Sequence, residues 1–312
     1  MLMNDEKHYN TISAYYKEKF KEKVCKIPLN AGFTCPNKDG SKGIGGCTYC
    51  SKSGSGDFAG SVYEPLEIQF QKIKAMMQQK WPDAYFIPYL QANSNTYKPL
   101  SELKKIYEPL LTIDERVVGI SIATRCDCLE QEKIEYLAEL NKIKPVQIEL
   151  GLQTIHEETA LLINRGHTLE EFKDAVHRLR EKGIEVVVHI INGLPYETKN
   201  MMIETAEFLN TLDIQGVKIH SLLILEGTKM GEDFKANPFP ILSLEEYKDI
   251  VVEQIRHLSK NIIIHRLAAD GVINDLIEPK WTIKKMVVMN EIDKEMRRIN
   301  AWQGDYALGN SE

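Results

Sequence analysis

The residues with the clearest chemistry are three cysteines in one glycine-rich stretch of the chain. Cys35, Cys47 and Cys50 are spaced C-x11-C-x2-C within residues 31–61. The two-residue spacing lets neighbouring thiolates bind one centre, and the glycines let the chain wrap closely around a bulky inorganic core. Three thiolates on a four-iron cluster leave one iron without a protein ligand. The spacing therefore favours an iron–sulfur cluster whose open iron binds a substrate or cofactor.

Spacing alone leaves other interpretations of these cysteines open. A zinc site normally takes four ligands, yet no histidine lies between residues 9 and 155, and Cys25 sits ten residues before Cys35 in an expected strand. Redox use of Cys47 and Cys50 as a thiol pair would need neither Cys35 nor the glycines. Inert buried thiols are a poor explanation for three cysteines in a polar loop.

A second pair of cysteines, Cys126 and Cys128, forms C-x-C at the end of an expected strand. Two thiols are too few ligands for a cluster of their own. We therefore interpret this pair as ordinary thiols, and the sequence assigns no role to Cys25, Cys126 or Cys128.

Polar side chains follow the other expected strands at the point where each strand ends. In parallel α/β architectures, reactive groups gather at the carboxyl ends of the strands. A strand end meets loops and water, so any one polar residue there also has a purely structural explanation. Their coincidence on successive strands predicts a shared site, which contains Gln91, Asn93, Thr124, Arg125, Gln153, His189, Asn192 and His220.

The elements that must position these residues alternate along residues 24–225. Near-continuous apolar runs predict strands at residues 24–30, 84–90, 117–122, 146–150, 184–191 and 217–223. Helices lie between them, with capping boxes expected at Thr154 and at Thr168. Six strand–helix units imply right-handed crossovers and a parallel sheet, either open and doubly wound or a partial barrel. After residue 225 we expect a helix starting at Ser243, a short strand at 262–265 and a helix near 283–299.

Composition narrows the class of protein. The 312 residues carry a net charge of −6 with 43 % apolar and 27 % charged residues, as in ordinary globular proteins. No apolar stretch approaches the length of a membrane span, and residues 1–7 have no apolar signal segment, so we expect a cytoplasmic protein without membrane contact. The acidic balance disfavours an indiscriminate nucleic-acid coat but permits a selective RNA enzyme.

The cysteine loop and eight further segments resemble one protein family. Residues 31–50, AGFTCPNKDGSKGIGGCTYC, are similar to the cluster loop of the YhcC/YtqA family of radical S-adenosylmethionine (SAM) proteins, which is related to the catalytic subunit of Elongator. One departure is Cys126, which stands where the family pattern has proline. The likeness covers nearly the whole chain and continues through residues 54–60, 89–96, 119–129, 149–153, 163–167, 189–195, 216–220 and 265–271.

This resemblance implies an architecture. It predicts a partial (β/α)6 TIM-type barrel, the radical SAM core, over residues 24–225, with the cluster loop at 31–61. Residues 1–23 would form an N-terminal extension. Residues 226–312 would form an α-rich C-terminal extension covering the barrel mouth.

The resemblance also implies roles for individual residues. Cys35, Cys47 and Cys50 would hold a [4Fe-4S] cluster, and the amino and carboxylate groups of SAM would bind its open iron. An electron donor such as flavodoxin or ferredoxin would then drive cleavage of SAM to methionine and a 5′-deoxyadenosyl radical. The expected SAM contacts are Gln91 and Asn93 for the amino group, Gln153 for the ribose or methionine, Arg165 for the carboxylate and His189 near the ribose.

The family points to a substrate less sharply than to a cofactor. Its YtqA branch suggests processing of a wobble uridine side chain in tRNA from carboxymethylaminomethyl toward aminomethyl. Residues 280–298 hold six Lys or Arg against three acids, which would suit RNA phosphates, although such excesses are often only solvated faces. Two alternatives stay open: a radical SAM enzyme acting on a metabolite or protein side chain, and a non-catalytic metal-binding regulatory protein.

Overall fold

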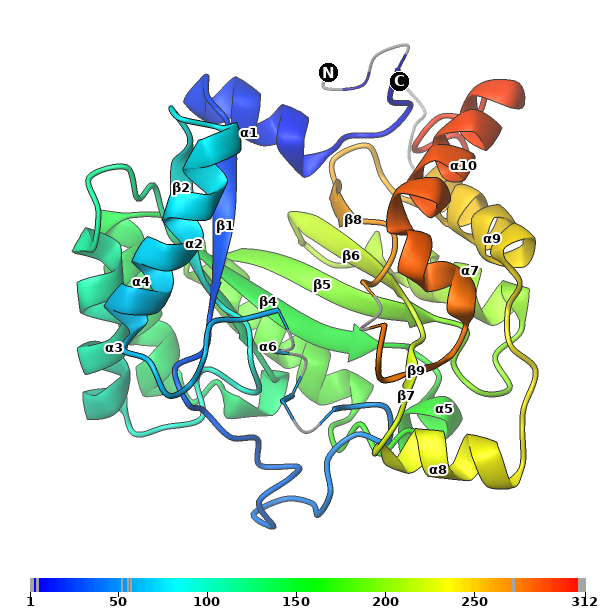
Figure 1. The fold of residues 1–312 in the computed structure, drawn as a ribbon, viewed down its shortest axis with the longest axis horizontal. Helices are drawn as coiled ribbons and strands as arrows, with labels where there is room; N and C mark the ends of the chain where they lie inside the picture. The colour runs from blue at the N-terminus through cyan, green and yellow to red at the C-terminus, as the bar shows by residue number, and fades with distance from the viewer. Residues whose placement is uncertain are drawn as a thin grey trace.

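The computed structural model contains one curled, fully parallel sheet of seven strands in the order β1-β2-β3-β4-β5-β6-β8 (Figure 1). It describes residue 3 and residues 6–51, 53, 54, 56, 58–270 and 273–307. Ser55 and Asp57 of the 54–60 segment and Gly271 of the 265–271 segment lie outside the described residues. The strands are β1 Val24–Leu29, β2 Tyr85–Leu90, β3 Ile120–Thr124, β4 Val146–Gln153, β5 Glu185–Asn192, β6 Gly216–Ser221 and β8 Ile263–Arg266.

The strands form where the sequence places apolar runs that can be covered on both faces. Val186, Val187 and Val188 of β5 are fully buried, as are Ile148 and Leu150 of β4. The expected partial barrel is confirmed, and the short strand expected near 262–265 joins it as β8, paired in parallel with β6. A sheet curled in this way brings the carboxyl ends of its strands to one rim.

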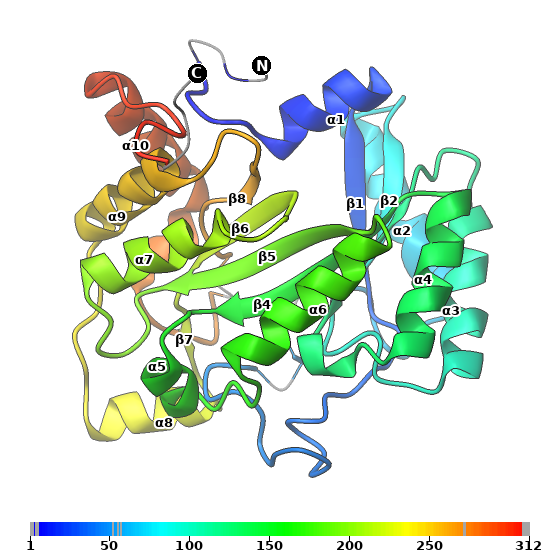
Figure 2. The same cartoon turned by 180° about the vertical axis from the view of Figure 1, so that it is seen from behind.

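Helices cover the convex face of the sheet, where α4, α6 and α7 lie in front of the strands (Figure 2). The helices of the part before residue 226 are α1 Ile12–Phe20, α2 Leu66–Lys80, α3 Leu100–Thr112, the 3-10 turn η1 Cys126–Cys128, α4 Gln131–Ile143, α5 Glu157–Leu162, α6 Leu169–Glu181 and α7 Lys199–Leu209. The apolar sides of α2, α3, α4, α6 and α7 pack onto the sheet in one core. Those of α1 form a separate cluster with Val24 of β1 and Ile87 of β2.

A capping box forms at Thr168, as expected, and another forms at Ser243, where a helix start was expected. Thr168 begins α6 and Ser243 begins α9, and in each case the side chain three residues later bonds back to the capping residue. The box expected at Thr154 is wrong. Helix α5 starts later, with His156 as its N-cap, because the Thr154 hydroxyl donates to Glu197 at 2.5 Å instead.

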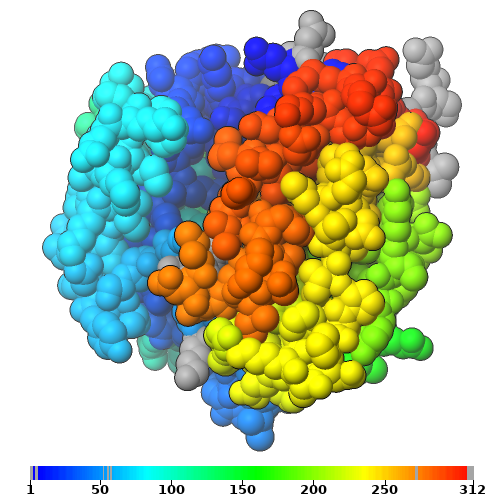
Figure 3. Space-filling model, turned by 45° about the vertical axis from the view of Figure 1, so that its right-hand side comes forward, coloured from blue at the N-terminus to red at the C-terminus, as the bar shows by residue number. Residues whose placement is uncertain are grey.

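The C-terminal part of the chain, after β6, packs against the sheet, including the side that the helices named above leave uncovered. Besides β8, it contains β7 Ile224–Leu225, α8 Lys229–Ala236, α9 Leu244–His257, β9 Leu276–Glu278, the 3-10 turn η2 Lys280–Lys284 and α10 Lys285–Arg298. In the space-filling view, a hollow separates the cyan segment that includes α2 from the orange segment that includes η2 (Figure 3). No helix in the described part of the chain is long and apolar enough to cross a membrane.

Candidate functional site

A cavity of about 280 Å³ lies at the carboxyl ends of the strands, between the cysteine loop and the C-terminal part. Its lining includes every site residue that the sequence and the family resemblance singled out for the cluster and for SAM. These eight residues are Cys35, Cys47, Cys50, Gln91, Asn93, Gln153, Arg165 and His189. The fold therefore brings together segments that are up to 154 residues apart in the sequence, the separation of Cys35 and His189.

The cysteine loop is held in shape mainly by backbone and amide hydrogen bonds. The Lys38 N–H donates to the Cys35 carbonyl at 2.8 Å, and the Cys50 N–H donates to the Cys47 carbonyl at 3.0 Å. Asn37 donates from Nδ2 to the Asn164 carbonyl at 2.6 Å, which ties this loop to the segment after α5. These bonds fix the backbone on either side of each thiol.

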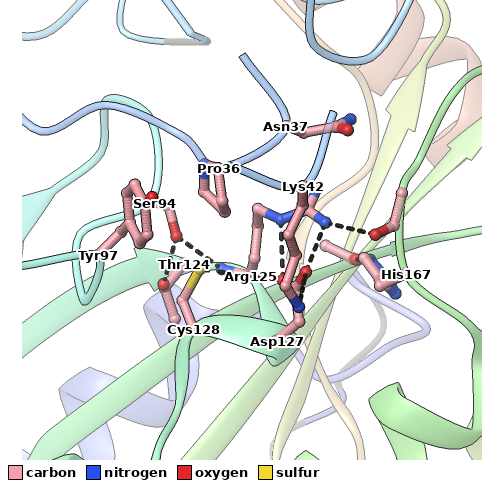
Figure 4. Close-up of polar contacts among 12 residues, drawn as sticks. Pro36, Asn37, Lys42, Ser94, Tyr97, Thr124, Arg125, Asp127, Cys128 and His167 are labelled. Carbon is pink, nitrogen blue, oxygen red and sulfur yellow. Dashed lines mark hydrogen bonds and ion pairs between the residues drawn. The ribbon is translucent and has the colours of Figure 1, made fainter. Parts of the chain in front are cut away.

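A charged clamp fastens the same loop to the end of β3 (Figure 4). The Arg125 guanidinium donates both to the Asp127 carboxylate, with two N–O distances of 2.9 Å, and to the Arg165 carbonyl at 2.7 Å. Lys42 of the cysteine loop donates to Asp127 Oδ2 at 2.9 Å, and Arg125 Nη2 donates to the same oxygen. Burial would raise the pKa of Asp127, but the bonds from Arg125 and Lys42 hold it below its usual value. The clamp therefore stays ionised at neutral pH.

The three loop thiols stay the predicted ligands of a [4Fe-4S] cluster. All three line the cavity. Three thiolates are the donor set that such a cluster with one open iron would use, each on a different iron. Burial raises the pKa of Cys47, while the nearby charge of Arg125 opposes that shift. A cationic neighbour of this kind favours the thiolate form that iron requires.

The remaining cysteines do not line the cavity. Cys25 is buried in β1, and Cys126 and Cys128 are buried in η1. Burial raises the pKa of both Cys126 and Cys128 to about 12, which keeps them as neutral thiols. Their interpretation as ordinary thiols stays a prediction.

The residues expected to contact SAM occupy distinctive backbone positions. Asn93 lies shortly after β2 and has a φ of +61°. Gln153 is the last residue of β4 and has a φ of +68°. The Asn93 side chain lies against Gly54, where an added Cβ would be 1.9 Å from Asn93 Oδ1, so only glycine permits this approach. Their assignment to SAM stays a prediction.

Arg165 has several protein partners of its own. Its side chain is 1 % exposed, and its guanidinium donates to three backbone carbonyls and to the Glu157 carboxylate. Four of its five N–H groups are therefore already used. These bonds leave one N–H group for a carboxylate of SAM, counted among the described residues. Arg165 therefore has a structural role in holding this loop, in addition to its predicted contact with SAM.

The far wall of the cavity is built around Glu149 of β4, which sequence reasoning placed in a motif but gave no role. Its carboxylate accepts hydrogen bonds from Lys26 at 2.6 Å, from Ser121 at 3.0 Å, from His189 at 2.8 Å and from Lys218. Burial alone would raise the pKa of Glu149, but the charges of Lys218 and Lys26 keep it well below its usual value. One buried carboxylate therefore stays ionised between two ammonium groups.

The histidines of this wall are neutral at physiological pH. Burial, followed by the charge of Lys218, lowers the pKa of His189 to about 4. A neutral His189 that carries its proton on Nε2 donates to Glu149. Burial likewise lowers the pKa of His220 well below its usual value.

Two family models match the chain. The model of the radical SAM superfamily matches residues 35–209, and that of a radical SAM C-terminal domain matches residues 214–298. The chain belongs to the radical SAM superfamily. Radical SAM enzymes use a [4Fe-4S] cluster, SAM and an electron donor, so membership implies all three for this chain.

Individual relatives agree with this assignment. The chain is 45 % identical over 303 residues to YtqA of Bacillus subtilis, which spans 97 % of this chain and 94 % of YtqA, and so confirms the resemblance to the YhcC/YtqA family. A tRNA uridine(34) acetyltransferase from Methanocaldococcus infernus is 29 % identical over 166 residues, which are 51 % of this chain and 29 % of that protein.

A solved radical SAM neighbour shares the fold. The structure of archaeal Elp3 from Methanocaldococcus infernus matches with a TM-score of 0.68 at 17 % identity. The match covers 90 % of this chain and 64 % of the Elp3 chain. At this identity the likeness concerns the fold, which includes the parallel sheet and the C-terminal part together.

Proposed function

We propose that this radical SAM enzyme acts on the side chain of a wobble uridine in tRNA and converts carboxymethylaminomethyl to aminomethyl. The observation that carries the proposal is the cavity itself, where a loop of three thiols faces buried side chains of both charges. The target side chain is small and carries both an amine and a carboxylate, so such a wall complements it. The partial relative named for tRNA uridine 34 supports an RNA substrate.

The bound cofactors would supply a primary carbon radical that removes one hydrogen atom from substrate. The best donor is the methylene between the amine and the carboxylate, since nitrogen and carboxylate both stabilise a radical there. Loss of one further electron to a one-electron acceptor and of one proton gives an imine. Addition of water then breaks the C–N bond, which releases glyoxylate and leaves the aminomethyl group on uridine.

The chain's own residues would divide this work between two walls. Cys35, Cys47 and Cys50 would hold the cluster. Gln91, Asn93, Gln153, Arg165 and His189 would position SAM, with Arg165 limited to its one free N–H group. The far wall of the cavity, around Glu149, would exclude water from the reacting carbon and orient the substrate.

Access for RNA would come from the C-terminal side. The base would have to leave its stack to enter the cavity, as base-modifying enzymes require. We propose that residues 226–312 cover the mouth of the barrel and that the basic residues of 280–298 meet phosphates. Residues 1–23 would form an N-terminal extension of the radical SAM core. The electron donor would be a flavodoxin or ferredoxin in the cytoplasm.

The experiment uses the anaerobically reconstituted enzyme, SAM, a chemical reductant and tRNA that carries carboxymethylaminomethyluridine. We expect 5′-deoxyadenosine and aminomethyluridine in equal amounts, measured by nucleoside mass spectrometry, and neither product from Cys47→Ala. If SAM is cleaved while the uridine is unchanged, the tRNA proposal is wrong and a metabolite or protein substrate replaces it. If SAM is not cleaved and one metal ion is bound by protein ligands alone, the chain is a metal-binding regulator.

A further inference from the structure

The far wall of the cavity carries a row of basic side chains in register across three strands. His189 of β5 lies opposite Lys218 of β6, and Lys218 lies opposite Arg266 of β8. Neighbouring strands are about 4.8 Å apart, so side chains on one face at matching positions lie side by side. All three residues line the cavity. Two cations from adjacent strands therefore face the same space.

The carboxylate nearest to this row does not balance its charge. Glu149 bonds to Lys218 and also to Lys26, so one negative charge is shared by two ammonium groups. Both ammonium groups also lie over the ring of Tyr89, at 4.6 and 5.2 Å from its centroid. The wall keeps a surplus of positive charge in a place largely shielded from water, where charges interact strongly.

The Arg266 guanidinium is held only weakly by the described part of the protein. Among the residues that the structure describes, its guanidinium has one ion-pair partner, Asp270, at 3.5 Å. Asp270 lies nearer to the Lys285 ammonium, at 2.6 Å. The Arg266 side chain is 33 % exposed, and it lines the cavity. Its planar fork of N–H groups can therefore bind an anion that enters the cavity.

His220 supplies an independent sign that a ligand belongs here. Its Nε2 atom is buried and has no hydrogen-bond partner among the described residues, although the residue lines the cavity. His220 stands two residues after Lys218 on β6, so both side chains point to the same face of the sheet. Buried polar atoms without partners are rare in folded proteins, and a functional role is one recognised explanation for such an atom in a residue that lines a cavity.

We propose that Arg266 and His220 bind the carboxylate of the substrate side chain, with Lys218 as the supporting charge. This proposal rests on the function proposed above and adds the residues that recognise its substrate. The neutral His220, protonated on Nε2, would donate one hydrogen bond, and Arg266 would donate two. This recognition would turn the methylene next to the carboxylate toward the thiol side of the cavity.

The test compares two anticodon stem-loops that differ only at position 34, one with carboxymethylaminomethyluridine and one with aminomethyluridine. Because their phosphates are identical, the ratio of their dissociation constants reports on the carboxylate alone. The reconstituted enzyme, without reductant, should bind the carboxylate form about tenfold more tightly or better. Arg266→Gln and His220→Phe should each reduce this ratio severalfold, and Arg266→Lys should restore part of it.

A matched control is Arg116→Gln, which removes a partly exposed arginine that pairs with Asp83 and does not line the cavity. It should leave the ratio unchanged. Thermal unfolding of each variant checks the fold, and 5′-deoxyadenosine formed from SAM without RNA checks the cluster and the SAM site. Both measurements should remain near the wild-type values for Arg266→Gln.

The outcomes separate this proposal from the proposed function. Conversion of the carboxylate RNA by the wild type together with an unchanged binding ratio in Arg266→Gln and His220→Phe would overturn this inference alone. Loss of SAM binding in Arg266→Gln with the RNA ratio intact would also overturn it, since Arg266 would then serve the SAM carboxylate. A wild-type enzyme that neither converts nor distinguishes the two RNAs would overturn both proposals.

Discussion

The two walls of the cavity are built in different ways. The thiol wall is a loop, and its position depends on backbone turns and on one clamp of Lys42, Arg125 and Asp127. The far wall of the cavity, called the charged wall below, consists of side chains inside strands, among them Glu149, His189, Lys218 and Arg266. The register of the sheet sets their positions. A loop site can be disturbed without unfolding the protein, whereas a strand site is part of the core. The two walls should therefore respond differently to substitution.

Loss of one loop thiol should give the largest effect on the cluster. Cys47→Ala removes a ligand that no nearby residue replaces, so we expect iron and sulfide contents close to zero after anaerobic reconstitution. The matched control is Cys126→Ala, which removes a buried thiol outside the cavity and should keep the wild-type iron content. Loss of the cluster in Cys126→Ala would show that the ligand assignment is wrong.

Loss of Glu149 should give the largest effect on stability. Glu149→Ala leaves the ammonium groups of Lys26 and Lys218 buried without their shared carboxylate. Breaking a buried ion pair in this way costs about 3–5 kcal/mol of unfolding free energy, measured by urea denaturation. The surface variant Glu226→Ala, which loses an exposed pair with Lys235, should cost less than about 1 kcal/mol. Equal losses in the two variants would contradict the distinction between the walls.

The clamp should affect the cluster more than the fold. Asp127→Asn removes the charge that Arg125 and Lys42 share but keeps one acceptor oxygen. We expect a loss of about 1–3 kcal/mol in unfolding free energy and severalfold faster removal of iron by a chelator. Lys98→Met, which breaks an exposed i,i+4 pair, is a control that should leave the chelation rate at the wild-type value. An unchanged chelation rate in Asp127→Asn would show that the clamp does not hold the loop.

The smallest expected effect is a pH dependence from the charged wall. Burial lowers the pKa of Lys218 to about 7, so this residue is charged below pH 7 and neutral above it. The preference for the carboxylate stem-loop should therefore fall severalfold between pH 6 and pH 8.5. Lys218→Met should show no such fall with the same two RNAs, and a parallel fall in that variant would assign the titration to another group.

Other shifted groups around Lys218 keep one charge state across this pH range. Burial and neighbouring cations lower the pKa of His189 to about 4 and the pKa values of His220 and His265 well below the usual histidine value. Burial keeps the pKa of Tyr89 well above its usual value. Glu149 remains ionised, and arginine does not lose its proton in proteins. The titratable and charged groups around Lys218 come from β1, β2, β4, β5, β8 and β6 itself. They are Lys26, Tyr89, Glu149, His189, His265, Arg266 and His220.

The sequence predicts the thiol wall more fully than the charged wall. The spacing of the cysteines and the polar strand ends pointed to residues that line one cavity, with one exception. Asn192 does not line it, and its buried side chain donates to Gln254 instead. Lys26, Glu149 and Lys218 were missed, although each is a charged residue within an apolar run that forms a parallel strand. A charged residue inside a buried apolar strand must be paired with another charge. This contrast with the neighbouring residues could have predicted the buried cluster from the sequence.

Contacts between distant segments could not be predicted from local patterns. Lys42 and Asp127 are 85 residues apart, and no periodicity links them. The expected capping box at Thr154 failed for the same reason, since Glu197, 43 residues away, takes the hydroxyl. Local rules succeeded at Thr168 and Ser243, where each partner lies within the same helix.

The decisive experiment for the assignment of the three loop thiols is reductive cleavage of SAM by the purified enzyme. We expect oxygen-free protein with about four irons per chain to release 5′-deoxyadenosine when a low-potential reductant is added. We expect Cys35→Ala, Cys47→Ala and Cys50→Ala to release none. Intact SAM after reduction of a fully loaded enzyme would contradict this assignment.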